Sequence, residues 1–205
     1  MSIQCRKWMY IALLPICCLL LIIPEISGCT KQERVSPPAP KPTPPLVEEW
    51  SADGVIKANE YHSSNKYDDY ELYWRSDEQY LYIGINAKTN GWVSIGIQPS
   101  SKMKDADMIF GFVEDGQVTV MDLFSTGNFG PHPPDVELGG TDDILVFGGG
   151  EEGEFTTIEF KRALSTNDNY DIPISAGVNK IIWSFGSNDS FTQKHAKRGY
   201  GEINI

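Results

Sequence analysis

Cysteine is scarce in this chain, and its four cysteines lie close to the N-terminus. Cys5, Cys17 and Cys18 come early, and Cys29 is the last of the four. If the segment before Cys29 is removed and the thiol of Cys29 is modified, the mature chain has no free thiol. This excludes a disulfide framework, a zinc ribbon, an iron–sulfur cluster and a haem attached covalently through cysteine. Stability must then come from a packed apolar core.

A long hydrophobic run is also missing. The main apolar stretch, from Trp8 to Ile23, follows Arg6 and Lys7 and is too short for a comfortable membrane span. A short apolar run behind a basic start is typical of a secretory signal. We therefore expect residues 1–28 to be a signal peptide and the rest to lie outside the cytoplasm.

The end of this segment resembles a bacterial lipobox. Ile26-Ser27-Gly28-Cys29 places small residues before a cysteine that would carry the lipid and become the first residue of the mature protein. An uncleaved anchor with an incidental cysteine is the alternative. Residues 29–49 are rich in proline and polar residues, which predicts an extended tether to the membrane or a disordered stub.

Positive charge is in short supply. The chain has 17 Lys and Arg residues against 28 Asp and Glu residues, a net charge of −11. Such a balance argues against binding to nucleic acid or to an anionic membrane surface. It is compatible with a cationic redox partner, although solubility alone explains an acidic surface.

Helical periodicity is nearly absent from residues 50–205, and Lys161–Leu164 is the only expected helical turn. Short segments rich in aromatic and β-branched residues alternate with turn residues, and Gly148–Gly150 is expected to be a loop. The pattern predicts one all-β domain, an antiparallel β-sandwich of the immunoglobulin-like kind. The expected strands are residues 70–74, 80–86, 92–97, 108–113, 117–124, 155–160 and 180–185.

The order of several short motifs resembles the DOMON domain family in its bacterial haem-binding form, over nearly the whole of residues 50–205. The motifs are Asp53-Gly-Val-Ile56 with Glu60-Tyr61, Gly91-Trp-Val-Ser-Ile-Gly96, Met103-Lys-Asp-Ala-Asp-Met108, Phe160-Lys-Arg-Ala-Leu-Ser-Thr-Asn-Asp168, Asp171-Ile-Pro-Ile174, Ile182-Trp-Ser-Phe-Gly186, and His195 with Arg198-Gly199. The resemblance implies a β-sandwich related to the cytochrome domain of cellobiose dehydrogenase. It also implies a non-covalent haem b whose iron has Met103 and His195 as axial ligands.

The residues themselves leave alternatives open. Met103 lies between two lysines, an odd place for a core side chain, whereas Met108 begins a strand-like segment and suits core packing or a pocket wall. His62 is in a polar stretch, and His132 in Gly130-Pro-His-Pro-Pro134 is expected to be exposed. His195 on sequence alone could equally be a surface histidine.

A haem would need further contacts. Its two propionates require cationic or hydroxyl partners, for which Lys197 and Arg198 are candidates because they follow His195 closely. Trp92 alternates with Ser94 and Gly96 and could line the haem face, although core packing explains it equally well.

Catalytic signatures are missing from the sequence: there is no nucleophile elbow, phosphate loop or His-Glu-x-x-His motif. Acidic pairs at 68–69, 105 with 107, and 142–143 could hold calcium, but turn chemistry explains them more simply. Two functions remain in which the domain is not an enzyme, and an oxidoreductase that acts directly on a substrate is a third alternative. One is one-electron transfer through haem, and the other is binding of a sugar or another small molecule without a redox role.

Overall fold

The computed structural model describes residues 49–205. The predicted signal peptide, the lipidated Cys29 and nearly all of the predicted tether lie outside the described residues. Within residues 49–205, no helix is long and apolar enough to cross a bilayer.

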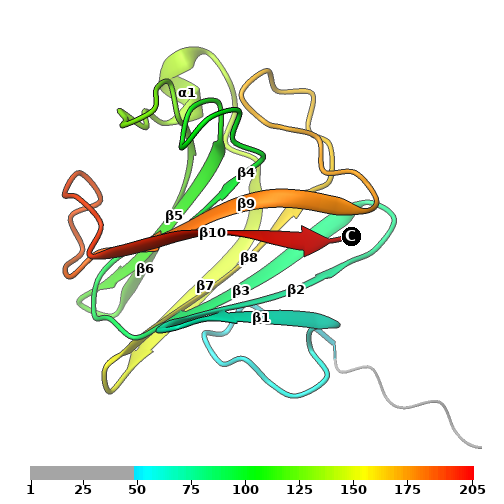
Figure 1. Cartoon of the computed structure of the whole chain (residues 1–205). Helices are drawn as coiled ribbons and strands as arrows, with labels where there is room; N and C mark the ends of the chain where they lie inside the picture. Colours follow the sequence, from blue (N-terminus) through cyan, green and yellow to red (C-terminus); the bar gives the residue numbers. More distant parts are fainter. Residues whose placement is uncertain (1–48) are drawn as a thin grey trace, which may run out of the picture. The chain divides into compact units, whose positions relative to one another are not determined.

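The described chain folds into two antiparallel five-stranded sheets, which confirms the predicted β-sandwich (Figure 1). The first sheet contains, in spatial order, β1 (Ser63–Tyr67), β2 (Tyr70–Ser76), β3 (Tyr80–Ala87), β8 (Phe155–Ala163) and β7 (Ile144–Glu152). The second contains β10 (Lys197–Asn204), β9 (Val178–Phe185), β4 (Val93–Ile97), β5 (Asp107–Glu114) and β6 (Gln117–Phe124).

The main core lies between the two sheets. Ile95 of β4 stands opposite Ile109 of β5 and Trp183 of β9, and all three side chains are buried. Ile85 and Ile158 are paired on the first sheet and belong to the same apolar cluster. Each such side chain contributes about 1.5–3 kcal/mol on full burial, so this cluster supplies the stability that disulfides do not.

The second sheet is also covered on its outer face. Side chains alternate along a strand, so Met108 and Phe110 face away from the core that contains Ile109. With Trp92 and Ile182 they form a second buried apolar cluster, and all five residues of β4 are buried. Parts of the chain outside the two sheets must therefore cover the outer face of the second sheet.

Two local predictions were wrong. Lys161–Ala163 end strand β8 rather than forming a helical turn, and the one helix in residues 49–205 is the short α1 (Asp135–Leu138). Gly148–Gly150 belong to strand β7 rather than a loop. A Cβ at Gly148 would overlap the carbonyl of Ala52, so the N-terminal segment packs directly on this strand and favours glycine there.

A buried ion pair joins the two sheets. Arg162 of β8 donates to Asp107 of β5, and its second nitrogen lies 3.1 Å from Asp171, which is in the loop before β9. The Arg162 and Asp107 side chains are 1% and 0% exposed. Loss of one partner from a buried pair leaves an uncompensated charge, which is costly.

We expect Arg162→Met to lower the free energy of unfolding by about 3–5 kcal/mol, because Asp107 and Asp171 would stay buried without a counter-charge. Chemical denaturation followed by tryptophan fluorescence measures the change. Lys180→Met, at an exposed position of β9, is the control and should change stability by less than about 0.5 kcal/mol. Equal effects of the two substitutions would contradict this role.

Candidate functional site

A cavity of about 790 Å³ lies over the outer face of the second sheet, and we call it the outer pocket. Its floor includes Trp92, Met108, Phe110 and Ile182, the residues of the second apolar cluster. Loops after β4, after β6 and after β9 supply the walls. The volume is in the range of small-molecule and cofactor sites.

A glycine in β4 shapes the floor. Gly96 pairs with Met108 and Ile182 on its two neighbouring strands. A Cβ on Gly96 would overlap the sulfur of Met108 and press on Ile182, at 2.7 Å from its Cγ1. The missing side chain therefore lets Met108 lie across β4 beneath the cavity.

The structure brings five of the six predicted haem-site residues to this one cavity. Met103, His195, Trp92, Met108 and Arg198 all line it. Met103 and His195 are half-buried and come from different loops, the first before β5 and the second before β10. In the Met103 loop, the amide of Ala106 donates a hydrogen bond to the carbonyl of Met103 at 3.1 Å and closes a turn. Next to His195, the amide of Ala196 donates to the carbonyl of Phe185 at 2.8 Å and holds the second loop to the end of β9.

The prediction that Lys197 faces the haem site, made because it is close to His195 in sequence, was wrong. It is not among the residues that line the outer pocket, and its ammonium pairs with Asp69 and, at 2.7 Å, with Asp68. Lys197 and Arg198 are neighbours on β10, and neighbours on a strand point to opposite faces. Only Arg198 can therefore face the cavity.

His132 was missed by the sequence reasoning, which expected it to be exposed. It is half-buried and lines the outer pocket, with its ring 5.8 Å from the ring of Phe110. The amide of Phe124 donates to the carbonyl of Pro133 at 3.0 Å, so the proline-rich loop folds back along the end of β6. No local sequence pattern indicates that His132 lies in the pocket, because its position depends on how the proline-rich loop packs against the end of β6.

Both imidazoles of the pocket favour the neutral form. Burial lowers the pKa of His132, and burial together with the nearby Arg198 and Lys194 lowers the pKa of His195. A neutral imidazole offers a nitrogen lone pair, which is what a metal ion requires.

The rim of the outer pocket is positive, unlike the chain as a whole. Lys102, Lys194 and Arg198, here called the rim cations, face a single acidic lining residue, Glu137. None of the rim cations forms an ion pair with carboxylates of residues 49–205. Lys102 instead lies over the ring of Phe129 at 4.1 Å. These cations fit a ligand that carries carboxylates at its exposed edge.

The donor set fits a haem. The floor is apolar and aromatic, thioether and imidazole donors are present, and the rim offers cations to propionates. The indole nitrogen of Trp92 and Nδ1 of His132 are buried with no hydrogen-bond partner.

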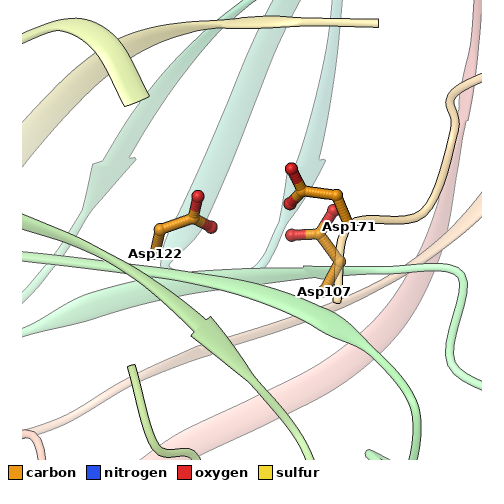
Figure 2. Close-up of side chains that lie close together, drawn as sticks. All are labelled: Asp107, Asp122 and Asp171. Atoms are coloured by element: carbon orange, nitrogen blue, oxygen red, sulfur yellow. The ribbon is translucent and has the colours of Figure 1, made fainter. Parts of the chain in front are cut away.

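A second polar centre, away from the outer pocket, is the carboxylate cluster of Asp107, Asp122 and Asp171. Figure 2 shows these carboxylates turned toward one another, and one oxygen from each lies within 4.8 Å of the others. Arg162 supplies positive charge here. The acidic residues considered for calcium disperse, since Asp68 and Asp69 pair with Lys197, and only Asp107 enters this cluster.

Burial changes the ionisation of this cluster. It raises the pKa of Asp122 to about 8, helped by the neighbouring charges of Asp107 and Asp171. Asp122 also accepts a hydrogen bond from the Asp143 amide at 2.8 Å, which ties the segment before β7 to β6. One carboxyl of the cluster is therefore protonated in the folded protein at neutral pH.

Because the folded protein holds this proton more tightly than the unfolded chain, stability should fall as the pH rises from about 4 to about 8, between the ordinary pKa of an aspartate and that of Asp122 in the folded protein. The slope for one titrating group approaches about 1.4 kcal/mol per pH unit. We expect Asp122→Asn to flatten this slope, measured by urea denaturation in the presence of a chelator. Asp115→Asn, at an exposed turn, should leave it unchanged. An unchanged slope in Asp122→Asn would contradict the assignment.

The fold and the outer pocket define a β-sandwich module with an apolar cavity over its second sheet. The chain belongs to the DOMON domain family, whose sequence model matches residues 64–186, more than half of the chain. The DOMON domain is a non-catalytic module, in agreement with the expectation that this chain is not an enzyme by itself.

Known proteins resemble the chain in part. It is 28% identical over 144 residues to MOXD1 homolog 1 of Drosophila melanogaster, covering 67% of this chain and 20% of that protein. It is 28% identical over 120 residues to mouse DBH-like monooxygenase protein 1, covering 58% of this chain and 19% of that one. The chain thus spans about a fifth of the length of these relatives.

Among solved structures, the cytochrome domain of Myriococcum thermophilum cellobiose dehydrogenase resembles the fold, with a TM-score of 0.51 and 13% sequence identity. The match covers 70% of this chain and 81% of that one. At this identity the likeness concerns the fold.

Proposed function

We propose that the domain binds haem b in the outer pocket, with Met103 and His195 as axial ligands, and transfers single electrons. The observation that carries the proposal is that one apolar cavity receives a thioether and an imidazole from two separate loops. The fold shared with a cytochrome domain supports it.

The residues of the outer pocket have different roles according to their positions. Met103 provides a soft sulfur donor that favours ferrous iron and raises the reduction potential relative to two nitrogen donors. His195 provides the nitrogen donor, and Arg198 with the other rim cations offers partners to propionates. Trp92 and Met108 exclude water from the floor. The bound haem would supply one-electron chemistry, and two filled axial positions would leave no site for oxygen.

The spectrum of purified protein tests this function. Protein produced with a supply of haem should be red, with a Soret band that shifts and sharpens on reduction by dithionite. Met103→Ala and His195→Ala should each change that spectrum and weaken haem retention, because each removes one iron ligand. His62→Ala, at an exposed residue that does not line the outer pocket, is the matched control.

Colourless protein that takes up no added hemin would contradict the proposal. Binding of a sugar or another small molecule without a redox role would then be the function to test, by calorimetry on the purified domain.

We further propose that the domain works outside the cytoplasm, held to a membrane by lipid on Cys29, and exchanges electrons with a partner protein. The lipobox-like residues before Cys29 support the attachment. A redox module that is not an enzyme by itself needs a donor and an acceptor.

Cys29→Ser should abolish lipid attachment, because serine has no thiol to form the thioether. Mass spectrometry of the membrane fraction should show the lipid mass on the wild-type chain and its loss in the variant. Cys18→Ser, within the segment expected to be removed, should behave as wild type. A wild-type chain that retains residues 1–28 or carries no lipid would contradict the attachment.

A further inference from the structure

The outer pocket contains a second imidazole that the proposed Met103 and His195 ligation does not use. His132 lies on the wall with its Nδ1 buried and without a hydrogen-bond partner. Leaving a buried polar nitrogen unpaired costs about 1–3 kcal/mol. Because Nδ1 is closed off from the cavity, a ligand there would meet this imidazole through its other nitrogen, Nε2.

The loop of His132 is joined to the loop of Met103. The amide of Asp105 donates to the carbonyl of Ser125 at 2.8 Å, and the amide of Ser125 donates to the carbonyl of Ala106 at 2.9 Å. The contact of Lys102 with Phe129, at 4.1 Å, adds a third link. His132 therefore belongs to the same wall as Met103, whereas His195 comes from the loop before β10.

The surroundings of His132 suit a metal better than a carboxylate. Its ring packs on Phe110, which is 3% exposed and itself packs on Trp92. A charged propionate beside these rings would lose its hydration without a cationic partner. The rim cations offer propionates a better place, so the partner that remains for His132 is the iron.

We propose that His132 is a reserve axial ligand, which binds the haem iron in place of Met103 when the thioether is absent. This inference rests on the proposed haem function. In such a variant an iron–nitrogen bond to His132 would occupy the position that the sulfur of Met103 would fill in the wild type, and no electron would be transferred. Because His132 is neutral, no proton has to leave. Two nitrogen ligands would lower the reduction potential compared with the Met and His pair.

The test removes the sulfur without changing the volume of the side chain. Met103→Leu, purified with haem, should remain six-coordinate and low-spin by electron paramagnetic resonance, with a lower midpoint potential than the wild type. Met103→Leu with His132→Phe should become five-coordinate and high-spin. Phenylalanine keeps a ring against Phe110, so the wall is preserved. Added imidazole should restore the low-spin spectrum of the double variant.

Met103→Leu with His62→Ala is the matched control and should resemble Met103→Leu alone. A five-coordinate Met103→Leu protein, or one that loses haem entirely, overturns the inference while the haem function of the wild type stands. So does a double variant that stays low-spin. Wild-type protein that takes up no haem overturns both.

Discussion

Arg162 carries a positive charge into the interior of the sandwich, where an unpaired ion would be prohibitively unstable. Its guanidinium survives there because Asp107 of β5 and Asp171 of the loop before β9 surround it. These ion pairs fix the geometry of the interior as much as they stabilise it, since buried ion pairs often contribute little net stability. The pair fixes the first sheet against the start of β5, four residues after Met103. The loop that presents the proposed sulfur ligand therefore ends at an anchored strand.

The outer pocket depends on a sheet that is apolar on both faces. Ile95 and Ile109 enter the main core, while Met108 and Phe110, one residue away from Ile109 on either side, form the floor of the cavity. A floor made of a hydrogen-bonded sheet cannot shift without breaking strand pairs, so it is rigid. The loops above it carry the donors, which is the usual division between scaffold and site. Function in this family of folds can thus vary through loop residues while the sheet is kept.

The strands that could be predicted are those whose side chains alternate or are rich in aromatic and β-branched residues, such as β3, β5 and β6. Strands β1, β7 and β10 were not predicted from residue pattern, because SSNKY, the glycines of β7 and the basic start of β10 carry little apolar signal. Their pairing is imposed by neighbouring strands. The same limit applies to the site. Met103 and His195 were predicted by family resemblance, whereas His132 entered the pocket only through the return of its proline-rich loop.

The net charge of the chain differs in sign from the charge around the outer pocket. The net charge of −11 suggested a cationic partner, yet the cations that line the outer pocket outnumber its one acidic residue. Composition sums over the whole surface, whereas a carboxylate at the cavity mouth interacts with charges within about 8 Å at physiological salt. Exposed lysines elsewhere, such as Lys66 and Lys197, are paired with acidic residues, and the rim cations are not. The rim cations are therefore left for a ligand, and through them an acidic protein would hold the proposed anionic cofactor.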